Sequence, residues 1–310
     1  MLISSPTDLP IPRNLTALMQ LLQLLVGPAG HRHWCGGLIN SDKAPGFLQK
    51  MIQRYPSVLR NARQRSYDRA CGRASVRLVV YPLLSVPRHN TLDKSVDRPA
   101  DMLLWWLLST DGTGGLADPL MPDHHVANDA MNSDAHIEVG DYVLAYVSKP
   151  VRRELIDKRT GAHRSIWKST STWTWKLRHT VHTEVRAAIV DCCRNLSPGR
   201  EPTGELPGHG LRCVLAAQRQ RPLFSGVRND VIELHRYAQE HWLAHEPRWL
   251  AQRTAEDSSR TPILRPLGEV LATQLPLMRR IAVFDQPPQR VADVLQRMRT
   301  SDADQSSPDT

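Results

Sequence analysis

Cysteine is scarce in this 310-residue chain and follows no regular spacing. The five cysteines form no Cys-x-x-Cys pair, and Cys192 and Cys193 are adjacent. A disulfide scaffold or a structural zinc site needs several cysteines at set spacings, so neither is expected. Unpaired thiols are typical of a reducing compartment, and the sequence therefore predicts a cytoplasmic protein.

Long apolar runs are also missing. The most apolar stretch covers residues 15–26, and Gln20 and Gln23 interrupt it. A helix that crosses a bilayer needs roughly 20 apolar residues, so no membrane span and no membrane partner are expected. The apolar residues of this stretch recur at helical spacing with both glutamines on the other face, which favours a core helix over a signal peptide. Asn14 is expected to cap that helix, and Gly27-Pro28 to end it.

The signatures of several enzyme classes do not occur. The sequence has no Gly-x-Ser-x-Gly elbow and no His-Glu-x-x-His segment, which argues against serine hydrolases and zinc proteases that depend on those motifs. The glycine-rich segment 112–115 lacks the Lys-Ser/Thr that ends a P-loop, so it is interpreted as a turn and an ATPase is not expected.

Positive charge is abundant and lies in blocks. The chain has 40 Lys and Arg against 31 Asp and Glu, a net charge of +9. Residues 31–90 contain eleven basic and two acidic residues, residues 91–141 two basic and ten acidic, and residues 142–200 twelve basic and four acidic. Two basic blocks on either side of an acidic one favour either a polyanionic partner or internal pairing.

The hydrophobic pattern predicts a helical beginning followed by strands. We expect, in chain order, a helix at 47–73, strands at 76–84 and 102–110, and a loop at 112–140 with a short helix near 126–131. Proline breaks the hydrogen bonding of a helix, so Pro56 is expected to kink or divide the first of these elements. Gly72 is expected to end it.

A long antiparallel hairpin is predicted between residues 142 and 178. Its strands are expected at 142–148 and 166–178, and a basic turn at 157–161. Trp173, Trp175 and Leu177 alternate with polar residues, which predicts a buried face of the sheet. Trp167 lies among cations and hydroxyl groups instead, and is the better candidate for stacking on a nucleic-acid base.

The rest of the chain has helical character. We expect a helix after residue 180, a linker at 195–210, a helix at 226–245, short helices at 267–275 and 277–284, a last helix from 288, and a disordered tail at 300–310. The predicted fold class is α+β, an antiparallel sheet with a long basic β-hairpin, flanked by helical N- and C-terminal regions. The predicted regions are 1–75, helical and Arg-rich; 76–180, antiparallel β; 181–299, helical; and the tail.

Nucleic-acid binding is the function that the basic blocks favour. Arginine binds phosphate oxygens in a bidentate manner, and each phosphate that a protein neutralises releases counterions from the nucleic acid. The candidate contact residues for DNA or RNA are Arg60, Arg63, Arg65, Arg69 and Arg73 of the first block, and Arg152, Arg153, Lys158, Arg159, Arg164, Trp167 and Lys168 of the hairpin. The alternative reading of the first block is internal pairing with the acidic residues 93–141, or a solvated helix face.

Two other functions remain open. The first is a metal-dependent nuclease in which carboxylates and histidines of residues 118–141 hold Mg²⁺ or Mn²⁺, with Asp134, His136 and Glu138 as the candidate catalytic residues. No cofactor is expected outside that alternative. The second is a non-catalytic subunit of a larger complex, in which the acidic block docks on the basic surface of another protein.

Overall fold

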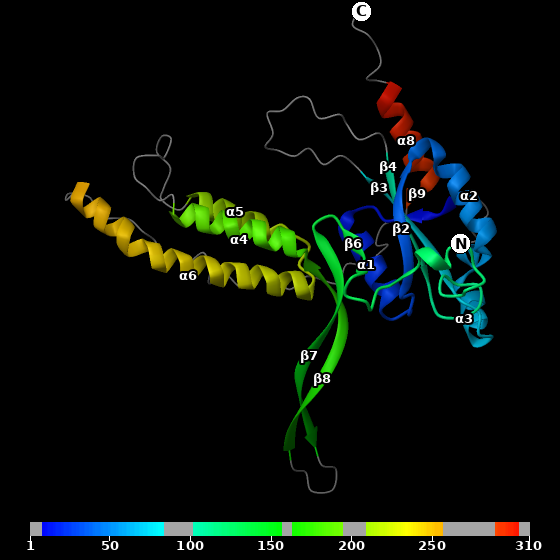
Figure 1. Ribbon diagram of the computed structural model, residues 1–310, viewed down its shortest axis with the longest axis horizontal. Helices are drawn as coiled ribbons and strands as arrows, with labels where there is room; N and C mark the ends of the chain where they lie inside the picture. The colour runs from blue at the N-terminus through cyan, green and yellow to red at the C-terminus, as the bar shows by residue number, and fades with distance from the viewer. Residues whose placement is uncertain (1–7, 84–101, 157–162, 195–208, 257–288, 304–310) are drawn as a thin grey trace, which may run out of the picture. The chain divides into compact units, whose positions relative to one another are not determined.

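The computed structural model describes residues 8–83, 102–156, 163–194, 209–256 and 289–303 (Figure 1). Within these ranges the chain is an α+β protein whose paired strands are antiparallel, as the sequence predicts. The helices expected at 267–275 and 277–284 and the turn expected at 157–161 lie outside the described residues.

Two compact units divide the chain, and each is assembled from separate segments. The first unit comprises Met1–His136, Ser148–Trp173 and Ile281–Thr310, and the second comprises Ile137–Val147 and Thr174–Arg280. Strands β7 (Tyr142–Ile156) and β8 (His163–Leu177) contribute residues to both units.

A four-stranded antiparallel sheet forms the centre of the first unit. Its order is β3 (Val76–Leu83), β4 (Met102–Ser109), β2 (His33–Asn40) and β5 (Asn128–Asp129). β4 pairs with both long neighbours, so Leu107 lies opposite Cys35 on β2 and opposite Leu78 on β3. The continuous apolar run of β4 is therefore an inner strand, which confirms the strand expected at 102–110.

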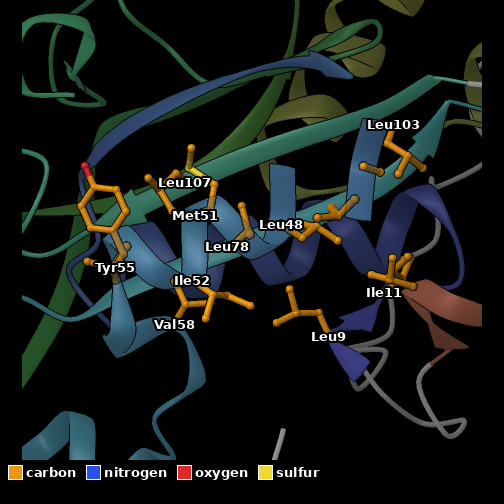
Figure 2. Packing of buried hydrophobic residues seen from close by; sticks show 14 of the residues in the cluster. Leu9, Ile11, Leu48, Met51, Ile52, Tyr55, Val58, Leu78, Leu103 and Leu107 are labelled. Carbon is orange, nitrogen blue, oxygen red and sulfur yellow. The ribbon is translucent and has the colours of Figure 1, made fainter. Parts of the chain in front are cut away.

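One face of this sheet packs against elements from both ends of the chain (Figure 2). The covering elements are β1 (Pro10–Ile11), α2 (Ala44–Arg54), η3 (Pro56–Leu59) and α8 (Val291–Ala303). β1 pairs with β9 (Gln289–Arg290), and this short sheet directs α8 onto the core. The helix α8 continues to Ala303, so the first residues of the tail expected at 300–310 are helical.

Helix α1 (Leu15–Val26) has the bounds expected from the sequence. The side chain of Asn14 accepts a hydrogen bond from Ala17 N at 2.8 Å, which caps the helix as predicted. Eight of its residues are buried, and none of them belongs to the cluster shown in Figure 2. The helix is thus a core element, because its amphipathic pattern matches the burial.

The helix expected at 47–73 is three shorter elements. Pro56 separates α2 from the 3₁₀ helix η3, and Arg60 is extended at the end of η3, before α3 (Ala62–Ala70) begins. Asn61 and Gln64 form a reciprocal capping box that starts α3. Gly72, with φ of 73°, follows the end of α3, as a residue without a Cβ allows.

The second unit joins the base of the β7–β8 ribbon to three helices. Its sheet has the order β6–β7–β8, where β6 is Glu138–Val139. The helices are α4 (His179–Arg194), α5 (His209–Arg219) and α6 (Ser225–Glu256). They bury apolar residues such as Ile189, Leu215 and Leu234 against one another. The hydroxyl of Thr174 on β8 accepts the hydrogen bond of Gly226 N at 2.9 Å, so a residue of the ribbon satisfies a backbone donor at the start of α6.

Three local expectations were wrong. The loop helix lies at His124–Val126 (η4) rather than near 126–131, where β5 forms instead by pairing with β2. The strands of the ribbon are each 15 residues long and extend beyond the ranges 142–148 and 166–178. α5 begins inside the expected linker, and α6 continues past residue 245.

Candidate nucleic-acid interface

The arginines of the first basic block do not share one helix face. Arg60 precedes α3 and Arg73 follows it, because α3 spans only Ala62–Ala70. The single helix expected at 47–73, which would have included all five candidate arginines, therefore does not form. Arg63 and Arg69 are exposed on α3, and Arg65 is half-buried.

Asp68 binds the two arginines that flank α3. Its carboxylate is buried, with an exposed fraction of 1%, and forms ion pairs with Arg60 and with Arg73, the latter at 2.8 Å. The hydrogen bond from Arg60 is the largest cause that lowers the pKa of Asp68, and that from Arg73 adds to it. Internal pairing thus occurs in this block. Asp68 of the same segment pairs with Arg60 and Arg73, and acids of the block 93–141 pair with Arg54 and Arg32, as described below.

The other arginines of this region concentrate positive charge. Arg69 lowers the pKa of Arg65, after the larger effect of burial, and Arg65 in turn lowers the pKa of Arg77 on β3 to about 10, again after burial. None of the three has an acidic partner among the residues that the structure describes. Arg65 instead donates a hydrogen bond to the carbonyl oxygen of Arg60.

His31 lies next to these charges and is itself uncharged at neutral pH. It is buried between α1 and β3, with Nδ1 3.2 Å from the carbonyl oxygen of Leu25 and Nε2 3.1 Å from the hydroxyl of Ser75. Because a carbonyl only accepts, Nδ1 carries the proton and Nε2 accepts from Ser75. Burial, and then the arginine charges, lower the pKa of His31 to about 4.

The ribbon presents a tryptophan and a row of hydroxyl groups. Trp167 is 71% exposed and Lys168 is exposed beside it. Across the two strands, the hydroxyl of Ser148 lies 2.5 Å from that of Ser169 and 3.3 Å from that of Ser171. The side chains of Arg152, Arg153, Lys158, Arg159 and Arg164 lie outside the described residues, so the basic character of the tip stays a prediction.

The predicted buried face of β8 is confirmed. Trp175 has no exposed surface and Leu177 is 5% exposed, whereas Trp173 is half-buried. Trp167 on the same strand is far more exposed than Trp173 and Trp175, so its ring is accessible to solvent while theirs pack against the protein.

Carboxylates of the acidic block pair with arginines and backbone groups. Arg54 donates to both oxygens of Asp123, at 2.7 and 2.8 Å, and Tyr55 donates to Oδ2 at 2.9 Å. Asp118 accepts from the backbone N–H groups of Gly114 and Leu120, which lower its pKa. This loop is therefore held by its own acids.

Similar pairs involve Asp111, Asp129, Glu138 and Asp141 of the block. Arg32 bridges Asp111 and Asp129 at 3.3 and 3.5 Å. In the second unit, Arg178 lies 3.3 Å from Glu138, and Arg221 lies 2.7 Å from Asp141. A carboxylate that already neutralises an arginine has less negative charge to offer a cation.

The candidate catalytic residues are not gathered into a metal site within the described part of the chain. Asp134 is exposed and accepts from the neighbouring Ser133 hydroxyl at 3.2 Å. His136 is half-buried and belongs to the first unit, and Glu138 belongs to the second. No group of three or more His, Cys, Asp or Glu side chains in the described ranges could hold a metal ion.

Two residues near the arginine cluster were not among the candidates from the sequence. Arg77 lies on β3 rather than on α3, and its charge is near enough to that of Arg65 for Arg65 to lower the pKa of Arg77. Tyr67 is 66% exposed on α3, with the guanidinium of Arg73 5.7 Å from its ring centroid. An exposed aromatic residue within a run of arginines was the signal in the sequence that could have indicated Tyr67.

Comparisons with protein-family models, with curated proteins and with solved structures find no match to this chain. In the described ranges, no helix combines the length and the apolar character that a bilayer crossing requires.

Proposed function

We propose that this protein binds nucleic acid through the phosphate backbone, with the arginines of α3 and the β7–β8 ribbon as two contact elements. The observation that carries the proposal is the group Arg65, Arg69 and Arg77. After the larger effect of burial, Arg69 lowers the pKa of Arg65, Arg65 lowers that of Arg77, and all three lower that of His31. These three cations lack an acidic partner among the described residues.

Such a group is unfavourable in the free protein. Like charges in a partly buried site repel one another, and burial removes the water that would screen them. A chain of phosphates supplies the missing negative charge and releases its own counterions on binding. Arg63, which is exposed and lies on α3 together with Arg65 and Arg69, adds a further cation to that helix.

The exposed aromatic residues favour single-stranded ligands. Trp167 and Tyr67 present ring faces to solvent, and stacking of a base on such a ring contributes roughly 1–3 kcal/mol. Ser169 and Ser171 next to Trp167 add neutral hydroxyl donors for phosphate oxygens. The proposal includes a cytoplasmic location, which the five free cysteines favour.

The test compares two triple variants that remove the same charge. One variant, Arg63→Gln with Arg65→Gln and Arg69→Gln, removes cations that have no acidic partner in the part of the chain that the structure describes. The control, Arg32→Gln with Arg178→Gln and Arg290→Gln, removes three cations that are half-exposed and already ion-paired.

Fluorescence anisotropy with single- and double-stranded DNA and RNA between 50 and 200 mM salt gives affinity and salt slope. Each phosphate contact contributes roughly 0.7–0.9 to the slope, so the α3 variant should lose about 2–3 units and the control less than one. Equal affinities and slopes for both variants would refute the proposal.

A further inference from the structure

The helical hairpin α5–α6 of the second unit contains buried side-chain nitrogens that have no hydrogen-bond partner among the described residues. They are Arg212 Nε on α5 and Arg228 Nε and His235 Nε2 on α6, and each is shielded from solvent. The exposed fraction of His235 is 7%. A buried polar atom without a partner destabilises the folded protein, so three of them in one helical hairpin require a physical explanation.

The positions of these residues follow the helical repeat. Five residues separate the end of α5 at Arg219 from the start of α6 at Ser225, so the two helices are antiparallel neighbours. Arg212 precedes Arg219 by seven residues on α5, and His235 follows Arg228 by seven residues on α6. Seven residues are two helical turns and about 10 Å of rise, which keeps the two residues of each helix on the same side of that helix.

Electrostatics connects the two helices. After the larger effect of burial, the positive charge of Arg219 lowers the pKa of His235, so the basic residues of α5 act on α6. α5 itself contains no acidic residue. On α6, Asp230 accepts the hydrogen bond of Leu177 N at 2.9 Å, and Glu233 faces His182 at 3.9 Å.

We propose that the α5–α6 hairpin binds phosphate groups of the nucleic-acid backbone, with Arg212, Arg228 and His235 donating to phosphate oxygens. This inference deepens the proposed function and rests on it for the source of the phosphate. The Arg fork donates to phosphate oxygens through Nε and Nη together, and an imidazole that carries a proton on Nε2 adds a single donor. Basic residues two turns apart on each helix match a ligand that carries a series of phosphates rather than one isolated anion.

The test uses the full-length protein and Arg→Met variants. Methionine keeps an unbranched apolar stem and removes the guanidinium. Arg212→Met and Arg228→Met should each lower the affinity for the oligonucleotide that binds best about tenfold, the loss expected for one charge-assisted contact. Arg236→Met is the matched control, because Arg236 is exposed on α6 next to His235. It should change the affinity less than twofold.

Thermal unfolding of the ligand-free variants distinguishes a binding role from a structural one. If Arg212 and Arg228 bind a ligand and do not stabilise the free protein, Arg212→Met and Arg228→Met should leave the Tm of the ligand-free protein unchanged or raise it. Each substitution removes a buried group that has no hydrogen-bond partner among the described residues. A lower Tm together with unchanged oligonucleotide affinity would mean that the arginines stabilise the helices through ordered water, and would overturn the inference.

The ring nitrogens of His235 provide a direct readout that needs no nucleic acid. Pyrophosphate, added to ¹⁵N-labelled protein, should shift the Nε2 resonance of His235 in the wild type and not in Arg212→Met. If pyrophosphate shifts the His235 resonance but oligonucleotides do not bind, the phosphate site is supported and the proposed nucleic-acid function is refuted. If the α3 variant loses nucleic-acid affinity while Arg212→Met and Arg228→Met keep it, the inference alone fails. If poly-glutamate shifts the resonance and pyrophosphate does not, the ligand is an acidic protein, and the inference is wrong.

Discussion

Protonation of His31 should destabilise the first unit as the pH falls from about 6.5 to 4. The folded protein holds this imidazole neutral, with its pKa lowered from 6.5 to about 4 by burial and by Arg77, Arg69 and Arg65. The unfolded chain has no such environment, so it takes up a proton at a higher pH than the folded chain does.

The sign and the magnitude follow from this difference. Because the folded pKa is depressed, the stabilisation is fully present above pH 6.5 and disappears as the pH falls through 4. A shift of about 2.5 pKa units corresponds to about 3 kcal/mol. Roughly 2 kcal/mol of this should be lost by pH 5. His31 is 4% exposed, so solvent screening reduces the effect little.

Urea unfolding at a series of pH values, followed by tryptophan fluorescence, measures the effect. In His31→Asn, the amide can still donate to the carbonyl oxygen of Leu25 but does not titrate. The difference in unfolding free energy between wild type and variant should therefore shrink by about 3 kcal/mol between pH 7.5 and pH 4, while other titrating groups cancel. His125→Asn, at an exposed histidine of η4, is the control and should show no such trend. A constant difference between wild type and His31→Asn across this range would refute the assignment of a buried neutral imidazole.

Three further predictions concern stability and reactivity. Asp68→Asn should lower the unfolding free energy of the first unit by about 2 kcal/mol, since it removes charge-assisted hydrogen bonds to Arg60 and Arg73, which are both half-exposed. An unchanged midpoint of urea unfolding would contradict these ion pairs. Gly226→Ala should lower the Tm, because the new Cβ would clash with the backbone oxygen of Trp175 on β8, and overpacking costs about 1–3 kcal/mol; the same substitution at Gly46, where nothing lies within 4 Å of the new Cβ, should not produce a steric clash. Cys71 is exposed and should react rapidly with a thiol reagent in the native protein. Cys35 is buried, burial raises its pKa to about 12, and it should not react. Equal labelling of the two cysteines, measured by mass spectrometry, would contradict this prediction.

Elements with strong local signals were predicted well. The bounds of α1 follow from its apolar period and from the capping side chain of Asn14, both of which act within one helix. Pro56 divides the following helix because the missing N–H is a property of the residue itself. The burial of Trp175 and Leu177 follows from alternation along one strand.

Elements that depend on distant partners were missed. β2 contains Gly36 and Gly37, which weaken the strand pattern, and it forms because β4 pairs along its whole length. Gly36 also suits its position there, since a Cβ would lie 2.7 Å from the carbonyl oxygen of Trp105. β5 is similarly a product of pairing with β2, and the sequence around it indicates only a loop.

In the candidate interface, too, some features follow from the sequence and others only from the tertiary structure. The excess of arginine in residues 31–90 and the exposed position expected for Trp167 are properties of composition and of local pattern, which the amino-acid order alone determines. Which arginine meets a carboxylate and which does not depends on the folded chain, because Coulomb interactions are strong only at short range in space. The tertiary structure therefore decided that Asp68 neutralises Arg60 and Arg73, and that the charge of Arg77 lies near that of Arg65. It also decided that Arg212 Nε, Arg228 Nε and His235 Nε2 are buried without a hydrogen-bond partner among the described residues.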